Sequence, residues 1–247
     1  MKHFIGLFAF LALFGRCAES PKSDTSGLAL TSGQENKNPE EQIRGLLTMN
    51  NGHAMFSDQL NNTTYKVVDK TQKLDQAYQD AAAPCHYPGE YVYTVLTGKF
   101  TGSDRMAPTG FEVYQIDTIS AKNPENLAII GVPFEFWCNG NEPFWSIQVS
   151  YFEGGIFYEN MSDGTAWFCP WIAPTANAAK DTWTYTIPQA MGKNDAMEIR
   201  IKKETCDDGM SEQVYDYSVE LKVHGATLKG VAIRGSGKIM GSKAISH

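Results

Sequence analysis

The stretch GLLTMNNGHAMFSDQLNNTTYKVVDKTQKLDQAYQDAAAP, at residues 45–84, decides the fold of the first half of the chain. Its first part holds three short runs rich in the apolar, aromatic and β-branched residues that favour strands: residues 45–50, 53–58 and 64–68. Its last part has apolar residues at helical spacing, which predicts a helix over residues 71–83. Asp69 or Thr71 can cap the start of this helix, and Pro84 ends it.

Two more strand-like runs follow, at residues 90–100 and 110–120. In the second run, alternate side chains should face opposite sides, with Phe111, Val113 and Gln115 opposed to Glu112, Tyr114 and Ile116. Three strands, one helix and two strands is the element order of an OB-type barrel. Residues 45–130 are therefore predicted to form an OB-like five-stranded barrel with one helix, which would close one end of the barrel.

Residues 131–247 favour a second β domain. Four runs alternate apolar and polar side chains with a period of two, at residues 146–152, 182–188, 196–203 and 216–223. In one of these runs Met197, Ile199 and Ile201 alternate with Glu198, Arg200 and Lys202. One apolar and one polar face per strand is typical of an antiparallel sheet that is exposed on one side. We therefore predict a mainly β protein, in which the OB-like barrel is followed by a small antiparallel β-barrel or sandwich.

The first seventeen residues, MKHFIGLFAFLALFGRC, are typical of an export signal. Their apolar run is shorter than the roughly 20 residues that a membrane-spanning helix needs. Cys17 follows this run at the position that carries the lipid in bacterial lipoproteins, although Arg16 stands where those signals prefer a small residue. Signal removal near Cys17 or Ala18 without a lipid is the alternative. Residues 18–44 are rich in Ser, Asn, Glu, Gly and Pro, which predicts a flexible tether.

The cysteines and the net charge limit the chemistry and the partners. Besides Cys17 there are four cysteines, an even number that suits disulfide bonds in an oxidising compartment: Cys85, Cys138, Cys169 and Cys206. Spacing does not choose among their three possible pairings, and none of them belongs to a C-x-x-C pair, which argues against zinc. The net charge of −7, from 21 basic and 28 acidic residues, argues against a nucleic-acid partner. We predict no metal and no cofactor.

The first module resembles the OB-like module of NlpE-type envelope lipoproteins. The resemblance lies in GHAMFSDQLNNTTYKVVDKTQKLDQAYQDA (52–81) and PGEYVYTVLTGKF (88–100). The residues that match the pattern of those proteins are Phe56, Asp58, Leu74, Tyr78 and Gly98. Gln59 stands where relatives often have a cysteine, so a disulfide from that site is not implied. The C-x-x-C copper signature of some relatives is also missing, and copper binding is not implied either.

The second module is similar to a poorly characterised family of bacterial lipoproteins. The strings that carry this resemblance are CNGNEPFWSIQVS (138–150) and CDDGMSEQVYDYSVEL (206–221). That family often has a Gly-Cys step in its last strand, whereas here Gly230 is followed by Val231. If Cys206 has a disulfide partner, the resemblance therefore leaves Cys138 as the choice. Both resemblances imply an envelope protein, and the first implies a connection with surface sensing, envelope stress or metal tolerance.

Aromatic residues crowd two segments, FWCNGNEPFW (136–145) and TAWFCPW (165–171). With two nearby carboxylates they give the candidate ligand-binding residues Trp137, Glu142, Phe144, Trp145, Trp167, Trp171 and Asp208. The rings can line a cleft for a sugar, haem or lipid, or they can fill a barrel core, which their strand-like spacing favours. Glu142 and Asp208 can form an acid–base pair, but carboxylates that cap turns are the favoured interpretation.

The resulting hypothesis is a non-enzymatic lipoprotein of the bacterial cell envelope, at the outer membrane or in the periplasm, that binds a partner or ligand. Its partners would be the membrane, through the N-terminal lipid, and an envelope protein or a small ligand. The first alternative is a carrier of a small apolar or aromatic ligand such as haem, lipid or sugar. A hydrolase that uses Glu142 and Asp208 is the weaker alternative.

Overall fold

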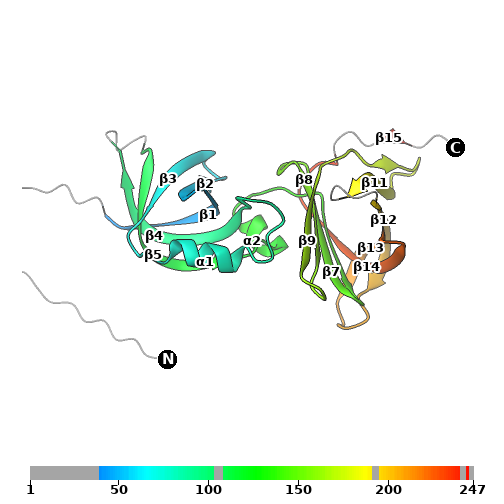
Figure 1. Cartoon of the computed structure of the whole chain (residues 1–247). Helices are drawn as coiled ribbons and strands as arrows, with labels where there is room; N and C mark the ends of the chain where they lie inside the picture. The colour runs from blue at the N-terminus through cyan, green and yellow to red at the C-terminus, as the bar shows by residue number, and fades with distance from the viewer. Residues whose placement is uncertain (1–38, 103–107, 191–194, 240–242, 245–247) are drawn as a thin grey trace, which may run out of the picture. The chain divides into compact units, whose positions relative to one another are not determined.

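The computed structural model describes residues 39–102, 108–190, 195–239 and 243–244 (Figure 1). The predicted export signal, Cys17 and the tether up to residue 38 lie outside the described residues. Both β modules belong to one compact unit. Neither of the two helices in the described ranges is long and apolar enough to span a bilayer.

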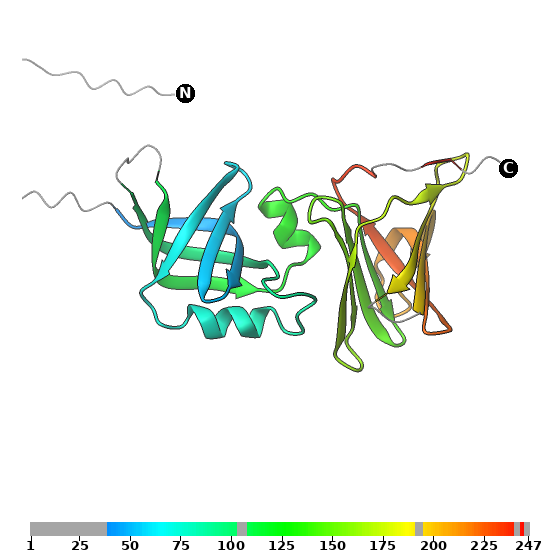
Figure 2. The same cartoon turned by 45° about the horizontal axis from the view of Figure 1, so that its top comes forward.

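The first five strands form a closed barrel (Figure 2). Their order around the barrel is β1-β2-β3-β5-β4, and only β3 and β5 are parallel. The helix α1 lies between β3 and β4 in the chain, so the predicted OB-like barrel with one helix is confirmed. The first strand begins at Glu41, inside the range that was assigned to the tether. The elements are β1 (Glu41–Asn50), β2 (His53–Asp58), β3 (Thr63–Asp69), α1 (Leu74–Ala81), β4 (Val92–Thr101) and β5 (Gly110–Ser120).

The barrel core is built from alternate residues of these strands and from one face of α1. Leu96 and Phe111 are fully buried, and α1 adds the buried side chains of Leu74 and Tyr78. The Tyr78 hydroxyl donates a hydrogen bond of 2.7 Å to the carbonyl oxygen of Glu90, which satisfies its polar end inside the core. The apolar spacing that predicted the helix is therefore the face that packs on the barrel.

The predicted alternation in β5 is wrong beyond Val113. The register between β4 and β5 shifts at two places, because extra residues are inserted in β5 opposite Leu96 and Gly98. Each such bulge exchanges the two faces of the strand. Gln115 is consequently exposed, and Ile116 packs against the barrel core instead.

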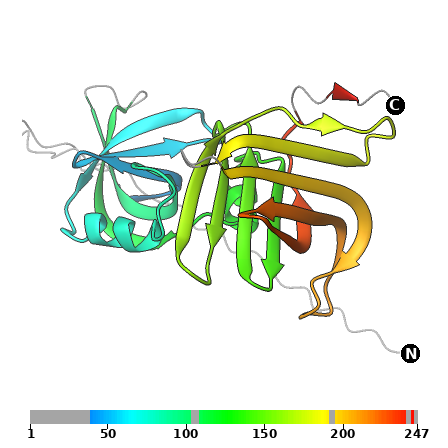
Figure 3. The same cartoon turned by 45° about the vertical axis from the view of Figure 1, so that its right-hand side comes forward.

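The second half forms one curled sheet, seen in Figure 3. Its order is β15-β10-β11-β12-β13-β14-β6-β7-β8-β9, and all neighbours are antiparallel except β10 and β15. The predicted small antiparallel β-barrel or sandwich is thus confirmed as a curled antiparallel sheet. Its strands are β6 (Phe136–Asn141), β7 (Phe144–Ser150), β8 (Gly155–Asn160), β9 (Thr165–Pro170), β10 (Thr175–Ala176), β11 (Thr182–Ala190), β12 (Asp195–Asp207), β13 (Val214–Val223), β14 (Ala226–Arg234) and β15 (Lys243–Ala244).

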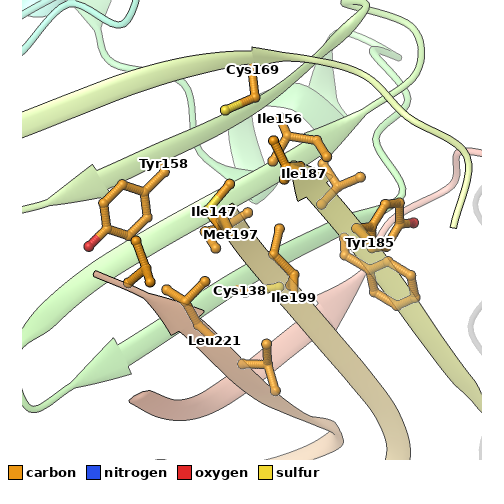
Figure 4. Packing of buried hydrophobic residues seen from close by; sticks show 14 of the residues in the cluster. Cys138, Ile147, Ile156, Tyr158, Cys169, Tyr185, Ile187, Met197, Ile199 and Leu221 are labelled. Carbon is orange, nitrogen blue, oxygen red and sulfur yellow. The ribbon is translucent and has the colours of Figure 1, made fainter. Parts of the chain in front are cut away.

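The inside of the curled sheet is filled by apolar side chains (Figure 4). Ile147, Ile199 and Leu221 come from three different strands and are fully buried there. Their polar neighbours in the sequence, such as Arg200 and Glu220, therefore face outward, because successive side chains of a strand point to opposite faces. The period-two pattern of the sequence therefore reflects side chains that alternate between the inner and the outer face of the sheet.

A short helix, α2 (Pro124–Ile129), follows the barrel and was not predicted. Asn123 and Asn126 form a capping box, in which each side chain accepts a hydrogen bond from the backbone of the other. Leu127 and Ile130 pack against Leu46, which faces outward from the barrel. The helix was missed because six residues are too few to show a helical period.

A buried ionic network lies where the segment after β5 meets the second sheet. Lys122 Nζ lies 2.6 Å from Glu153 Oε1 and 3.7 Å from Glu90 Oε1, and it lies over the ring of Phe157. His86 Nδ1 also contacts Glu90, at 2.8 Å. Burial alone would raise the pKa of Glu90, but the hydrogen bond from His86 and the charges of His86 and Lys122 lower it. Glu90 therefore stays ionised between His86 and Lys122.

Candidate functional site

An open groove of about 620 Å³ lies on the outward, polar face of the second sheet. The two sequence strings at residues 138–150 and 206–221 both contribute to it, although they are far apart in the chain. The groove is formed by β6, β12, β13, β14 and the turn that follows β12. The residues that line it are Asn139, Gly140, Asn141, Arg200, Lys202, Glu204, Cys206, Asp207, Asp208, Gly209, Ser218, Val219, Glu220, Lys229 and Gly230.

Strand register places three charged side chains of the groove in one row. Arg200 of β12 is paired with Glu220 of β13, and Glu220 is paired with Lys229 of β14. Neighbouring strands lie about 5 Å apart. The ion pair of Glu220, however, is made with Lys222 of its own strand, at 4.0 Å. The row has the charge order positive, negative, positive. The row forms because Arg200 and Glu220 stand at polar positions of their strands, and because Lys229 is paired with Glu220.

A bulge in β12 closes one side of the groove. The register of β12 with β13 shifts between Lys203 and Cys206, and a shift of this kind bends the bulged strand. Figure 3 shows the curved course of β12. The turn after β12 consequently reaches the β6–β7 hairpin, where Asn141 Nδ2 donates a hydrogen bond of 2.7 Å to the carbonyl oxygen of Asp208.

Asp208 lines the groove, but its carboxylate serves the turn. It accepts hydrogen bonds from the backbone N–H groups of Met210 and Ser211, at 2.9 and 2.8 Å, and from the Ser211 hydroxyl. These hydrogen bonds lower the pKa of Asp208, so the side chain stays ionised. A carboxylate that accepts these hydrogen bonds caps the turn. This is the role that the sequence favoured for Asp208.

Glu142 lies apart from the groove lining. With Pro143 it forms the two-residue turn between β6 and β7, and its side chain is exposed. Within the described residues no hydrogen bond or ion pair joins Glu142 to Asp208. The geometry therefore gives no support to an acid–base pair made of these two residues.

The remaining charges of the groove are only partly paired. Lys202 Nζ and the Ser218 hydroxyl both donate to Glu204, each at 2.5 Å. These two hydrogen bonds lower the pKa of Glu204, and both of its carboxylate oxygens already have a hydrogen-bond donor within the protein. Arg200 and Lys229 make no side-chain hydrogen bond or ion pair with any other described residue. They are the cations of the groove that still have all their hydrogen-bond donors available.

The predicted disulfide bonds are not found. No disulfide joins any two of Cys85, Cys138, Cys169 and Cys206. Cys138 is buried on the inner face of the second sheet, whereas Cys206 lines the outer groove and donates to the carbonyl oxygen of Tyr217 at 3.1 Å. The sheet itself separates these two sulfur atoms, so the pairing of Cys138 with Cys206 is wrong. The cysteines therefore give no support for an oxidising compartment.

The aromatic candidates do not line a common cleft. Trp145 and Trp167 belong to the buried core of the second sheet, which is the interpretation that their spacing favoured. Trp171 donates a hydrogen bond of 3.0 Å to the buried carboxylate of Glu135 and packs on the edge of Tyr151. These contacts give all three tryptophans a structural role in the described residues.

The other two aromatic candidates lie on the outer face of the second sheet. Trp137 packs edge-on against Phe134 and lines a cavity of about 110 Å³ beside Glu90 and Lys122. Phe144, at the start of β7, is 49% exposed. Neither ring belongs to the lining of the groove, although Phe144 lies on the hairpin that carries Asn141.

Sequence reasoning missed the cations Arg200, Lys202 and Lys229. The signal that could have found them is their position on the polar side of period-two strands that would be neighbours in the sheet. Arg234, at the end of β14, is by contrast turned inward, where it donates to the carbonyl oxygens of Glu135 and Gly237. The described residues contain no cluster of His, Cys, Asp and Glu suited to a metal ion.

Comparison with known proteins gives no match: no protein-family model, no curated protein and no solved structure is significantly similar to this chain.

Proposed function

We propose that this protein is a non-enzymatic lipoprotein of the bacterial cell envelope, attached through Cys17, that binds a partner in the groove of its second sheet. The observation that carries the binding role is the open groove of about 620 Å³, to which two unusual strings from distant parts of the chain both contribute. The export pattern at residues 1–17 and the resemblance to envelope lipoproteins support the location.

The groove is better suited to binding than to catalysis. Its carboxylates Glu204 and Asp208 are occupied by hydrogen bonds that keep them ionised, whereas a general base needs a pKa near the working pH. Partial burial, together with the charges of Glu204 and Asp207, raises the pKa of the Cys206 thiol. A raised pKa disfavours the thiolate, which is the nucleophilic form of cysteine. These groups therefore hold the shape and charge of the groove.

The attachment is tested by mass spectrometry of the mature N-terminus. We expect a lipid on Cys17 and the loss of residues 1–16, and Cys17→Ser should release the protein from the membrane fraction. Recovery of the wild-type chain with Met1 in place would contradict the proposed attachment.

A substitution that fills the groove tests whether the groove is the binding site. Ser218→Trp places a large ring on the groove floor, whereas Thr227→Trp places the same ring on an exposed position of β14 outside the groove. In a deletion strain with an altered envelope-stress reporter, we expect the Thr227→Trp protein to restore the reporter and the Ser218→Trp protein to fail at equal abundance. Full restoration by Ser218→Trp would exclude the groove as the binding site.

One observation favours a carrier as the second candidate function. The indole nitrogens of Trp145 and Trp167 and the hydroxyl of Tyr185 are buried without a hydrogen-bond partner among the described residues. Buried donors without acceptors are costly, and a small ligand with acceptor atoms inside the sheet would satisfy them. Titration with haem, a fatty acid or a sugar should then change tryptophan fluorescence, and a flat response to all three would remove this candidate.

A further inference from the structure

We infer that a cavity between the barrel and the second sheet is a pH-sensitive latch, which holds the two modules together while Glu159 is protonated and loosens when Glu159 is ionised. The cavity has a volume of about 110 Å³ and shares no described lining residue with the groove. The inference goes beyond the proposed function, because it concerns how the modules are held together. It rests on the walls of the cavity, on the pairing of its charges and on the burial of Glu159.

Each module supplies one wall of this cavity. On the second sheet the wall is the outer face of β6, β7 and β8, where strand register places Ser146 of β7 opposite Glu159 of β8. The barrel contributes the segment between α1 and β4, which carries His86 and Glu90, and it contributes Lys122 after β5. Separation of the two walls would therefore expose the charged groups of the cavity to water.

The charges at the cavity leave one carboxylate without a partner. Glu90 lies 2.8 Å from His86 Nδ1 and 3.7 Å from Lys122 Nζ, and Glu153 of the turn after β7 lies 2.6 Å from Lys122 Nζ. Within the described residues the Glu159 side chain makes no hydrogen bond or ion pair. Three carboxylates thus face two groups that can carry a positive charge. A proton on Glu159 removes one excess negative charge from this cluster.

The burial of Glu159 gives the direction of the pH dependence. Burial raises the pKa of Glu159, the charge of His86 lowers it and the charge of Glu90 raises it, and the pKa as a whole is raised. Because the barrel wall contributes to this burial, the pKa should return toward its ordinary value when the walls separate. A group whose pKa is higher in the closed state stabilises that state fully below its ordinary pKa, and the contribution is lost as the pH rises through the raised value.

Glu90 acts in the opposite sense. Its pKa is lowered in the closed state, so it favours the closed state above its ordinary pKa and stops doing so as the pH falls through the lowered value. The latch should consequently be strongest between the lowered pKa of Glu90 and the raised pKa of Glu159. It should loosen as the pH rises above that range.

Three more groups that can titrate lie next to the cluster. Burial raises the pKa of the Cys85 thiol and of the Tyr87 hydroxyl, so both stay neutral where Glu159 titrates. Tyr91 lines the cavity as well. His86 can take up a proton, and the experiment must therefore distinguish its titration from that of Glu159.

The experiment uses Trp137, which is the one tryptophan among the described lining residues of the cavity. Acrylamide quenching of tryptophan fluorescence is measured on the full mature protein between about pH 5 and about pH 8, a range that begins above the ordinary pKa of Glu. We expect the quenching constant to increase with pH, because the open state exposes Trp137. Each unit by which the pKa of Glu159 differs between the closed and the open state changes their ratio about tenfold. Trp137→Phe should remove the increase.

Two variants assign the increase to Glu159. Glu159→Gln keeps the shape of the side chain but cannot ionise, so its quenching constant should stay low over the whole pH range. Glu212→Gln removes a carboxylate from an exposed position of the same module outside the cavity, and it should keep the increase of the wild type. Carbon-13 NMR of the Glu159 carboxyl in the wild type measures its pKa directly, which we expect above the ordinary value for Glu.

A quenching constant that does not increase with pH in the wild type would overturn the inference. So would an increase that persists in Glu159→Gln, which would assign the titration to His86, or a Glu159 carboxyl that titrates at or below the ordinary pKa of Glu. Each of these results would leave the proposed function intact, because Cys17→Ser and Ser218→Trp test attachment and binding at other places in the chain.

Discussion

At the scale of single residues, Lys122 illustrates what a buried charge requires in this protein. Its side chain is 4% exposed and that of Glu153 is 3% exposed, so both charges are removed from water. Removing charges from water costs several kcal/mol per ion, and only close partners offset that cost. Glu153 at 2.6 Å and Glu90 at 3.7 Å provide the compensation. Each member of the network is therefore needed as long as the others are present.

Replacing Lys122 by Met should lower the free energy of unfolding by about 3–5 kcal/mol, because it leaves Glu153 buried without a cation. The matched control is Lys222→Met, which breaks the pair with Glu198 at a position where Lys222 is 54% exposed. An exposed pair contributes less than about 1 kcal/mol. Urea denaturation of both variants measures the difference, and equal losses would show that Lys122 is not held in a buried network.

Gly140 lies against the indole ring of Trp145. A Cβ atom at residue 140 would lie 2.2 Å from Trp145 Nε1 and 2.8 Å from the carbonyl oxygen of Lys229. Gly140→Ala should therefore destabilise the second sheet by about 1–3 kcal/mol through overpacking. In the background of Trp145→Leu the same change should cost less, because the indole is gone. Urea midpoints that do not move with Gly140→Ala would contradict this contact.

At the scale of elements, the start of α1 depends on Asp69. Its carboxylate accepts hydrogen bonds from the Thr71 backbone and hydroxyl, both at 2.7 Å, and from the Leu74 backbone at 3.0 Å. Partial burial alone would raise the pKa of Asp69, but the hydrogen bonds from Thr71 and Leu74 outweigh it and lower the pKa below its ordinary value. The N-cap position itself is held by Lys73, which makes no side-chain cap hydrogen bond, so neither Asp69 nor Thr71 is the N-cap residue that was predicted. Asp69, in ionised form, instead accepts from the first N–H group of the helix from four residues before the cap.

This lowered pKa predicts a specific dependence on pH. A group whose pKa is lower in the folded state stabilises the fold fully above its unfolded pKa, and the contribution is lost as the pH falls through the folded pKa. Asp69→Asn should therefore reduce the loss of thermal stability between about pH 5 and pH 2, measured by circular dichroism. Asp80→Asn, on the exposed side of the same helix, is the control. Identical acid dependence in wild type and Asp69→Asn would contradict this role of Asp69.

The strands that could be predicted are those with one face exposed to solvent. In β12 and β13 apolar and polar residues alternate, because one face packs inside and the other meets water. The strand β8 was not predicted, because it is buried on both faces. Ile156 and Tyr158 lie in the core of the sheet, while Phe157 packs against Tyr87. A strand covered on both sides has no alternation for sequence reasoning to detect.

The candidate site could be predicted only in part. The two strings that build the groove were recognised, and Asp208 was placed among the candidates, because unusual runs of residues are visible in the sequence. Arg200 and Lys229 were not, because their proximity depends on the strand order β12-β13-β14 and on the register of both pairs. The bulge after Lys203 was equally hidden, since one inserted residue leaves no compositional trace.

At the scale of the whole molecule, the first described strand, β1, is the strand that closes the barrel. The strand β1 pairs with both β2 and β4, and it contributes the buried side chains of Ile43, Leu46 and Leu47. Each such side chain adds roughly 1.5–3 kcal/mol when it is fully buried. Their sum is comparable with the roughly 5–15 kcal/mol of stability of a whole domain.

A chain that begins at Pro39 should consequently keep the melting temperature of the mature protein, whereas a chain that begins at Asn51 should lose the folded barrel. Near-ultraviolet circular dichroism and thermal melting distinguish the two outcomes. If removal of residues 1–50 left a cooperative transition of unchanged midpoint, β1 would not be needed to close the barrel. If removal of residues 1–38 lowered the midpoint, the N-terminal segment would contribute to the stability of the unit.

The two modules differ in one respect that concerns motion. In the first module every strand is hydrogen-bonded on both sides, so its circumference is fixed. In the second, β9 comes close to β11, yet the described strands form no ladder between them. The circumference of this sheet can therefore widen without breaking a single main-chain hydrogen bond. What holds β9 and β11 together is the packing of buried side chains, Trp167 and Cys169 on one and Tyr185 on the other, so a change in this core sets how far the open side of the sheet parts.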